Sequence, residues 1–329
     1  MERILFLPGD GQGPANVGAA LRVVNAVDGA VEAAVGDIGS AAYEKYGASL
    51  PYETLDLVGG CPVIVSGPTQ ESIDGRDPLA DLMGQMDLYG RRRRFVTLAE
   101  GHGVPGTDVT IWGTSSSGRA GISETRDVDG VTISKHIGTA VYARIMAAAM
   151  TDMELRGASR AECIAREDLF PEASGSIYES FDLLFQREGI ESRHCNVTDW
   201  VPRFVSDPAS FGFIVASDLY AIIAERLAAS FTGGIAMSPL KLVGGDSTLI
   251  LPCGESGTRD SVSAAMTAVY ALEDIGHREE AARAEEAIRR ALAEEPESGR
   301  IEPGAFADLV VSMLRRARPS IDIFYRLPD

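Results

Sequence analysis

Residues 4–17, ILFLPGDGQGPANV, restrict the possible folds more than any other part of the sequence. A short apolar run ends at a proline, a glycine-rich turn follows, and a helical pattern begins at Pro14. Glycines let such a turn adopt positive φ angles, and proline is tolerated in the first turn of a helix. The stretch therefore predicts a strand, a turn and a helix. The turn is either a loop whose free N–H groups attract a ligand, or only a tight connection.

Apolar runs of strand length alternate with helical patterns along the rest of the chain. Residues 61–66 form a continuous apolar run, which is typical of a strand buried on both faces. We also expect strands at residues 95–99, 193–201 and 248–252. Asp129-Gly130 predicts the turn of a hairpin within residues 121–134. This alternation predicts an α/β fold with a largely parallel sheet and an inserted antiparallel piece.

The composition is that of an ordinary soluble protein and excludes several partners. The net charge of −18 argues against binding to nucleic acid or to a membrane surface. We expect no secretory leader, and no apolar run is long enough to span a bilayer. The four cysteines are scattered without the spacing of a metal site or a disulfide framework. We therefore expect reduced thiols and a cytoplasmic protein.

Nearly all the positive charge is arginine, because the chain of 329 residues has only three lysines. Arginine stays charged and cannot serve as a tunable proton acceptor, as lysine can. The run Arg91-Arg92-Arg93-Arg94 is the densest group. It is too short for nucleic-acid binding, and we expect it to be partly a ligand clamp and partly solvated.

Several stretches together resemble the isocitrate and isopropylmalate dehydrogenase family, the metal-dependent β-decarboxylating dehydrogenases. Residues 7–14 (LPGDGQGP) are similar to its opening signature, and Asp87-Leu88-Tyr89 followed by Arg93 is similar to an aspartate-leucine-tyrosine segment and the arginine after it. Residues 206–215, 231–239 and 266–276 match three later segments in order. The resemblance implies two α/β domains, residues 1–96 with 237–329 and residues 97–236. It also implies at least a dimer, with a substrate cleft between the domains.

The family oxidises a 2-hydroxy acid with NAD(P) and decarboxylates the product, using a divalent cation held by aspartates. By the resemblance, the three ligand positions fall on Thr198, Ile222 and Arg226, and the catalytic lysine falls on Arg166. None of these residues can replace its counterpart. Of the substrate-binding residues only Arg93 is retained. We therefore predict that no metal binds.

The resemblance also places the nicotinamide cofactor. Asp10 and Gly11 lie in the opening turn, and Gly254, Ser256 and Gly257 lie in residues 253–260, about half the length of the family's cofactor loop and without its histidine. These five positions are the expected cofactor contacts. The shortened loop argues against NAD(P) binding in the manner of the family.

Arginines stand where the family lines its cleft with other residues, and clustered arginines favour bidentate binding of carboxylate or phosphate. We therefore expect a metal-free cleft for a small anionic ligand. The alternative is that the arginines pair with nearby acids such as Glu167, Asp168 and Glu225. The arginines concerned are Arg93, Arg119, Arg166 and Arg226.

Other polar residues complete the candidate site. Ser115 and Ser117 could donate hydroxyl hydrogen bonds to the anion, although a solvent loop is the alternative. His136 is the best candidate for a proton carrier, and Arg166 stands in the place of a catalytic group. No nucleophilic triad is present in the sequence.

Three functions remain open. The first is a repurposed, metal-independent enzyme of this fold, in specialised metabolism, acting on a small carboxylate or phosphate. The second is a catalytically inactive homologue that binds a ligand or a partner subunit. The third is an NAD(P)-dependent 2-hydroxy-acid oxidoreductase. We expect a homodimer in each case.

Overall fold

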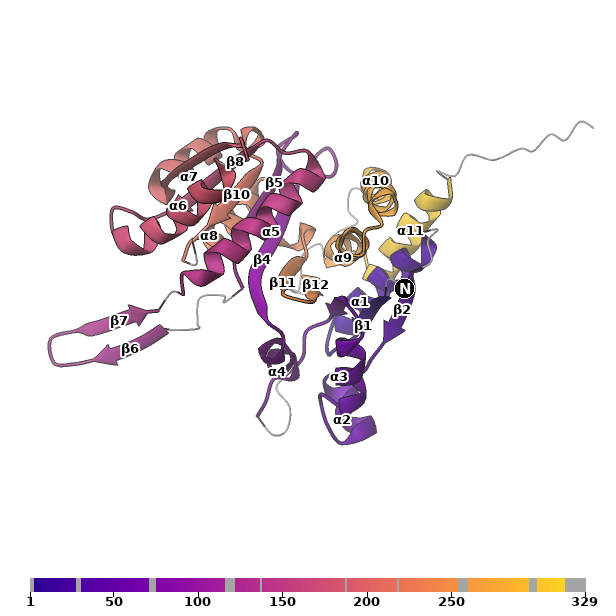
Figure 1. The fold of residues 1–329 in the computed structure, drawn as a ribbon. Helices are drawn as coiled ribbons and strands as arrows, with labels where there is room; N and C mark the ends of the chain where they lie inside the picture. The colour runs from indigo at the N-terminus through magenta and orange to yellow at the C-terminus, as the bar shows by residue number, and fades with distance from the viewer. Residues whose placement is uncertain are drawn as a thin grey trace, which may run out of the picture.

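A single large sheet runs through the molecule, with helices on both of its faces (Figure 1). The computed structural model describes residues 3–27, 31–70, 75–115, 122–136, 138–186, 188–217, 219–253, 260–295 and 301–316. The strands are β1 (Arg3–Leu7), β2 (Glu32–Val35), β3 (Val63–Ser66), β4 (Leu88–Val96), β5 (Asp108–Thr114), β6 (Ile122–Arg126), β7 (Val131–Lys135), β8 (Arg160–Ala165), β9 (Glu191–Asn196), β10 (Phe213–Ala216), β11 (Leu240–Gly244) and β12 (Thr248–Leu251). The helices are α1 (Gly13–Ala26), α2 (Ser40–Tyr46), α3 (Tyr52–Gly59), α4 (Pro78–Gln85), α5 (Ala140–Arg156), α6 (Pro171–Phe185), α7 (Val197–Ser206), α8 (Ala221–Ser230), α9 (Asp260–Asp274), α10 (Arg278–Glu294) and α11 (Pro303–Arg316).

The strand order is β2-β1-β3-β12-β11-β4-β5-β10-β8-β9. Two parallel wings, β2-β1-β3-β12 and β5-β10-β8-β9, flank a centre in which β12, β11, β4 and β5 pair antiparallel. The predicted α/β class with a largely parallel sheet is confirmed. Parallel strands end at one edge of a sheet, where ligand sites of α/β proteins usually lie.

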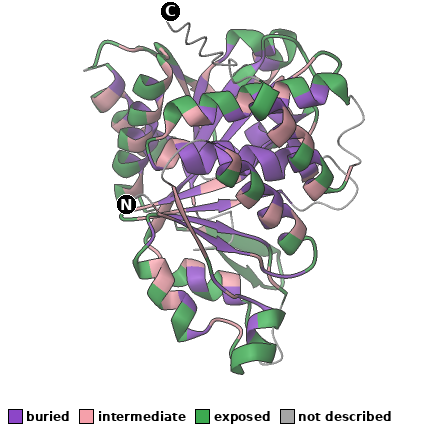
Figure 2. Ribbon diagram, turned by 90° about the vertical axis from the view of Figure 1, so that its right-hand side faces the viewer, coloured by how far each residue is buried: buried purple, intermediate pink, exposed green. Residues whose placement is uncertain are grey.

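Helix α9 is the core of the first wing. Every residue from Ser261 to Leu272 is buried, and the helix packs against α1, α10 and α11. In the second wing α8 and α5 cover opposite faces, since the neighbours Ile111 and Trp112 of β5 enter different apolar clusters. Figure 2 shows the buried residues concentrated in the central strands and the helices next to them.

The opening turn is a close packing of two loops. Gly9 and Gly11 have positive φ angles, of 69° and 58°. A Cβ atom on Gly9 would lie 2.3 Å from the Pro68 carbonyl oxygen, and one on Gly13 would lie 2.2 Å from the Pro8 carbonyl oxygen. The turn therefore needs glycine for contact with the loop after β3, which is the tight connection considered from the sequence.

The predicted hairpin is confirmed, and it projects away from the body of the protein (Figure 1). Its two strands, β6 and β7, form a separate antiparallel sheet. Two other predicted strands begin or end at different residues in the structure. Strand β9 stops at Asn196, and residues 197–201 begin α7, an amphipathic helix that buries Trp200 and Phe204. Strand β4 begins at Leu88, seven residues before the predicted start.

The error at β4 has a physical cause. Four consecutive arginines interrupt the apolar pattern that indicates a buried strand, yet all four are buried. Acids from distant elements pair with them, as described below. The strand β11 was not predicted at all. Among the described residues, no helix is long and apolar enough to cross a membrane.

Candidate functional site

Strand β4 directs its arginines alternately to the two faces of the sheet, as the two-residue period of a strand requires. Arg91 and Arg93 lie on the side of α8, where both reach Glu225. Arg92 and Arg94 lie on the side of α5, α9 and α10. The expectation that the run is partly solvated was wrong, since the four residues are between 1% and 9% exposed.

The Glu225 cluster, formed by Arg91, Arg93 and Glu225, lies between β4 and α8. Arg91 donates from Nε and Nη2 to the two carboxylate oxygens of Glu225, at 2.9 and 2.7 Å. Nη1 of Arg93 approaches the same carboxylate only to 4.0 Å, and Nε of Arg93 is buried without a hydrogen-bond partner. Two guanidinium groups thus share one carboxylate, which leaves one positive charge in excess.

The three residues that the resemblance assigns to the family's cation do not have the side chains of a cation site. Ile222 and Arg226 lie on the outer face of α8, both exposed, and Thr198 is exposed on α7. Glu225 is the acid of this part of α8, and its two oxygens are already engaged by Arg91. Hard cations require several free oxygen ligands. The described ranges also contain no group of three or more acids, histidines or cysteines arranged to hold a metal ion.

Helix α8 packs closely on β5 at Gly113. A Cβ atom on Gly113 would lie 2.6 Å from the Cβ of Ala221. A larger side chain at residue 113 would therefore displace α8.

Arg166 follows β8 at the edge where the parallel strands end. Its guanidinium donates from Nε and Nη2 to Asp168, at 2.8 and 2.9 Å. This pairing lowers the pKa of the Asp168 carboxyl and raises that of Arg166. Burial raises the pKa of the neighbouring Tyr220 hydroxyl. The alternative of pairing with nearby acids is therefore realised for Arg166 with Asp168 and, at 4.0 Å, for Arg93 with Glu225.

Ser115 and His136 line one pocket, at the root of the β6–β7 hairpin. This pocket lies beside α5, on the face opposite α8, so it is separate from the Glu225 cluster. Ser115 donates its hydroxyl proton to the Leu88 carbonyl oxygen at 2.5 Å. His136 is exposed. Among the predicted residues these two are brought together, while Arg93, Arg166 and Arg226 do not line this pocket.

Of the predicted cofactor-binding residues, the structure describes Asp10 and Gly11. The carboxylate of Asp10 is engaged in hydrogen bonds within the protein. One oxygen of Asp10 accepts from the Ser40 N–H at 2.8 Å, and the other accepts from the Gln70 N–H at 2.9 Å. Gly11 faces open space, since a Cβ atom added there would meet no atom within 4 Å. In the first turn of α1, the fully buried side-chain amide of Asn16 has no hydrogen-bond partner. NAD(P) binding stays a prediction.

Some predicted residues lie outside the described part of the chain. They are Ser117, Arg119, Gly254, Ser256 and Gly257. Their roles stay predictions.

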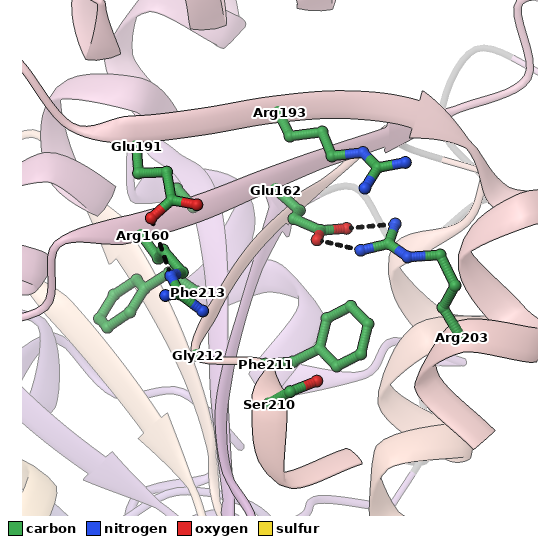
Figure 3. A pocket seen from close by; sticks show the side chains of 10 residues that line it. Arg160, Glu162, Glu191, Arg193, Arg203, Ser210, Phe211, Gly212 and Phe213 are labelled. Carbon is green, nitrogen blue, oxygen red and sulfur yellow. Dashed lines mark hydrogen bonds and ion pairs between the residues drawn. The ribbon is translucent and has the colours of Figure 1, made fainter. Parts of the chain in front are cut away.

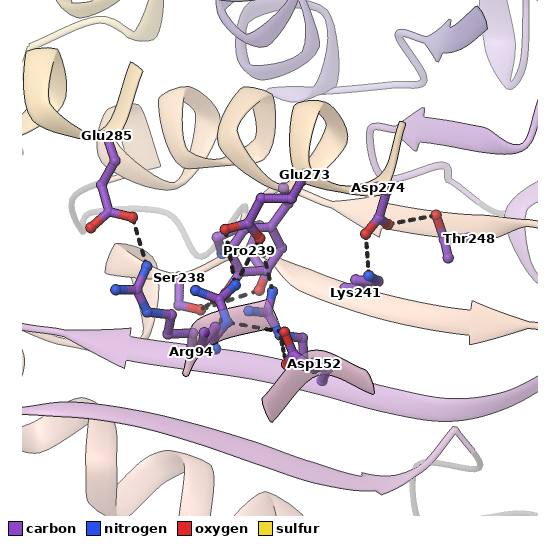
Figure 4. Close-up of polar contacts among 12 residues, drawn as sticks. Arg94, Asp152, Ser238, Pro239, Lys241, Thr248, Glu273, Asp274 and Glu285 are labelled. Carbon is purple, nitrogen blue, oxygen red and sulfur yellow. Dashed lines mark hydrogen bonds and ion pairs between the residues drawn. The ribbon is translucent and has the colours of Figure 1, made fainter. Parts of the chain in front are cut away.

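An ion-pair network occupies the other face of β4 (Figure 4). Arg92 donates to Asp152 at 2.9 Å, Arg156 donates to Glu273 at 2.8 Å, and Lys241 pairs with Asp274. Burial raises the pKa of Asp152, but attraction by Arg92 and Arg156 outweighs this and lowers it to about 2. The network lines a cavity of about 680 Å³ between α5, α9 and α10.

A smaller pocket lies at the opposite end of the second wing, where β8 and β9 begin (Figure 3). Arg203 donates to both oxygens of Glu162, and Arg160 pairs with Glu191 at 3.0 Å. Most of its charges are thus paired within the pocket.

The chain is similar in sequence to several known dehydrogenases. No family model matches the chain. The 3-isopropylmalate dehydrogenase of Methanothermobacter thermautotrophicus is 24% identical over 304 residues, 89% of this chain and 91% of that protein. The isocitrate/homoisocitrate dehydrogenase of Thermus thermophilus is 25% identical over 335 residues, covering 95% and 98%.

The fold gives the same result. The structure of isocitrate dehydrogenase from Methylococcus capsulatus superposes with a TM-score of 0.80 at 22% identity, over 96% of this chain and 100% of that one. The chain is therefore similar in both sequence and fold to isocitrate and isopropylmalate dehydrogenases, from which it diverges strongly. A β-decarboxylating dehydrogenase from Thermococcus kodakarensis has the same TM-score at 20% identity, over 96% and 97%.

The Glu225 cluster could be foreseen only in part from the sequence. The sequence indicated Glu225 only as an alternative partner, and Arg91 only as part of a run expected to be partly a ligand clamp and partly solvated. The spacing was a usable signal, because Arg91 and Arg93 must share one face of a strand. The contact with Glu225, 134 residues away from Arg91, has no signal in a single sequence.

Proposed function

We propose that this member of the dehydrogenase family acts, as an enzyme, on a small carboxylate or phosphate without a divalent metal. The observation that supports this is the excess charge of the Glu225 cluster. Arg93 is 7% exposed, its Nε has no partner, and the nearest carboxylate already binds Arg91. A buried charge is costly unless it is paired. An anionic group of a ligand would supply the missing partner of Arg93.

The residues present define what such a site does. Arg93 binds and orients an anionic group through charge-assisted hydrogen bonds. Arg166, in the place of the family's lysine, stabilises negative charge but transfers no proton, because arginine remains charged. No step is assigned to a metal ion, because the side chains at residues 198, 222 and 226 are not cation ligands. His136 as a proton carrier stays a hypothesis.

Titration calorimetry tests the proposal, with citrate, malate and inorganic phosphate as probes. We expect at least one of them to bind equally in EDTA and in Mg²⁺, and Arg93→Ala to weaken it at least tenfold. Arg160→Ala is the matched control, since it removes an exposed, paired arginine far from α8. Binding that requires Mg²⁺, or that is unaffected by Arg93→Ala, would contradict the proposal.

The second candidate is a homologue that binds a ligand or partner subunit without catalysis. The bidentate pairing of Arg166 with Asp168 favours it, because that guanidinium is already engaged. The third, an NAD(P)-dependent 2-hydroxy-acid oxidoreductase, is suggested by what the relatives are named. Titration with NAD⁺ and NADP⁺ discriminates between these, since tight binding of either would favour the redox enzyme.

We also propose a homodimer that uses the hairpin. Ile122, Val131 and Ile133 share one face of β6–β7 by register and are 45%, 48% and 70% exposed. The same face also carries Glu124, Arg126 and Lys135, and the opposite face carries serine and threonine. An isolated two-stranded ribbon is marginal in water, so a surface that covers its three exposed apolar residues is expected. A second copy of the chain is the proposed cover.

The four cysteines are free thiols, which suits the proposed cytoplasmic location.

A further inference from the structure

The charges of the Glu225 cluster are buried and can be counted. Arg91, Arg93 and Glu225 are 6%, 7% and 2% exposed. Arg91 donates from Nε and Nη2 to both oxygens of Glu225, so this pair is neutral. Arg93 reaches the same carboxylate only at 4.0 Å. The cluster therefore holds a single excess positive charge, and that charge lies on Arg93.

The surroundings of Arg93 are apolar apart from this cluster. In the part of the chain that the structure describes, Glu225 is the one carboxylate within 4.0 Å of an Arg93 nitrogen. Phe95 lies two residues further along β4, and Ile111 is the partner of Arg93 on β5, so both share its face of the sheet. Both are fully buried, and they pack in one apolar cluster with Ala224 of α8.

In such surroundings the charge of a bound group decides how well it is held. Attraction to the cluster grows in proportion to the charge of the group. The cost of removing the group from water grows with the square of its charge, and in a protein interior this cost is large. One negative charge neutralises the excess of the cluster. A second negative charge finds no further uncompensated cation and lies beside the carboxylate of Glu225.

Building on the proposed function, we propose that Glu225 makes the anion site selective for a singly charged group, such as a carboxylate, over a doubly charged one, such as a phosphate monoester. Glu225 acts through Arg91, which it neutralises, and so leaves Arg93 as the one cation that a ligand compensates. The selectivity depends on the net charge of the cluster. Of the two ligand classes proposed above, it favours the carboxylate.

Methanesulfonate and sulfate test this selectivity, because both are tetrahedral oxyanions and they carry one and two negative charges at neutral pH. Calorimetric titration measures their binding at constant ionic strength, since salt screens charged ligands. We expect the unaltered protein to bind methanesulfonate at least tenfold more tightly than sulfate. We expect Arg93→Ala to weaken the binding of both.

Two variants separate the net charge of the cluster from its other properties. Glu225→Gln leaves Arg91 and Arg93 both uncompensated, so sulfate should bind at least as tightly as methanesulfonate. Arg91→Gln combined with Glu225→Gln returns the cluster to one excess charge and should restore the preference for methanesulfonate. The double variant removes both members of a buried pair, which is better tolerated than removing one, so it serves where Glu225→Gln alone does not fold. Glu286→Gln, at the exposed pair with Arg290, is the control and should leave the preference unchanged.

The outcomes distinguish this selectivity from the proposed function. If both probes need Arg93 but sulfate binds as tightly as methanesulfonate in the unaltered protein, the selectivity is refuted and the proposed anion site stands. An unchanged preference in Glu225→Gln, or a preference for sulfate in the double variant, would also refute it. If neither probe binds, or if Arg93→Ala changes neither affinity, the selectivity and the proposed function both fail.

Discussion

At the scale of residues, the molecule depends on arginines buried in the centre of its sheet. A buried guanidinium is tolerated only where acids and hydrogen bonds compensate for lost hydration. Arg91 meets this condition with Glu225, and Arg94 meets it with Asp108 and Glu285. Arg93 does not meet it fully, since its Nε has no partner. Residues left incompletely paired in this way are where a ligand gains most by binding.

The Glu225 cluster predicts a large stability effect. Glu225→Gln removes the charge that compensates Arg91 and Arg93, and breaking a buried ion pair from one side costs about 3 kcal/mol. We expect a loss of this size in the free energy of unfolding, measured by urea denaturation. Glu286→Gln, at an exposed pair with Arg290, should change it by less than about 0.5 kcal/mol. Equal effects of the two substitutions would contradict the assignment of Glu225.

At the scale of elements, apolar periodicity predicts most of the helices and the outer strands. The strands predicted at residues 61–66 and 248–252 correspond to β3 and β12, and the hairpin turn at Asp129-Gly130 is confirmed. Strand β4 could not be recognised, because its inward residues are charged and their partners come from α5, α8, α9 and α10. Strand β11 was missed, although it lies at the antiparallel centre of the sheet.

The candidate site also depends on contacts between distant parts of the chain, which apolar periodicity does not reveal. Arg93 was found through the resemblance, and Ser115 and His136 were named from the sequence. That the latter two share a pocket with Lys135 and Arg144 depends on how the hairpin meets α5, which local patterns do not encode. The roles proposed for Arg93, Ser115 and His136 remain predictions.

The hairpin gives a prediction at this scale. The double substitution Ile122→Glu with Ile133→Glu replaces two exposed apolar residues of β6–β7 by charged ones. The dissociation constant of the proposed homodimer should therefore rise at least tenfold. Sedimentation equilibrium measures this. Leu183→Glu, at an exposed apolar residue of α6, is the control and should leave the association unchanged. A monomer in the unaltered protein, or a dimer that resists the double substitution, would contradict the proposal.

At the scale of the whole molecule, one sheet joins the two wings and an ion-pair network reinforces their junction. Arg92 of β4 contacts Asp152 of α5 and Glu273 of α9, and Arg94 contacts Glu285 of α10 (Figure 4). The two-domain division at residues 97 and 237 stays a prediction. The network would hold the proposed domains together on the face opposite the Glu225 cluster.

The network makes stability depend on acid pH. The pKa of Asp152 is about 2 in the folded protein, below its ordinary value of 3.8, so its contribution is present above about pH 4 and is lost as the pH falls toward 2. The difference corresponds to about 2 kcal/mol. The stability gap between the unaltered protein and Asp152→Asn should narrow by that amount between pH 5 and pH 2. Burial raises the pKa of Glu285, but Arg94 and Arg289 outweigh this and lower it, so Glu285 should act in the same direction. Asp308→Asn, at the exposed pair with Arg22, is the control, and a gap for Asp152→Asn that stays constant across this range would contradict the prediction.

The central claim is that arginine has replaced the divalent cation in the anion site of this fold. Crystals soaked with Mn²⁺ and a binding anion, citrate or phosphate, test it most directly through the anomalous scattering of manganese. We predict anion density against Nε of Arg93 and no manganese peak within coordinating distance of Glu225, Ile222 or Arg226. A manganese peak bound to α8, with Glu225 turned away from Arg91 to coordinate it, would contradict the claim.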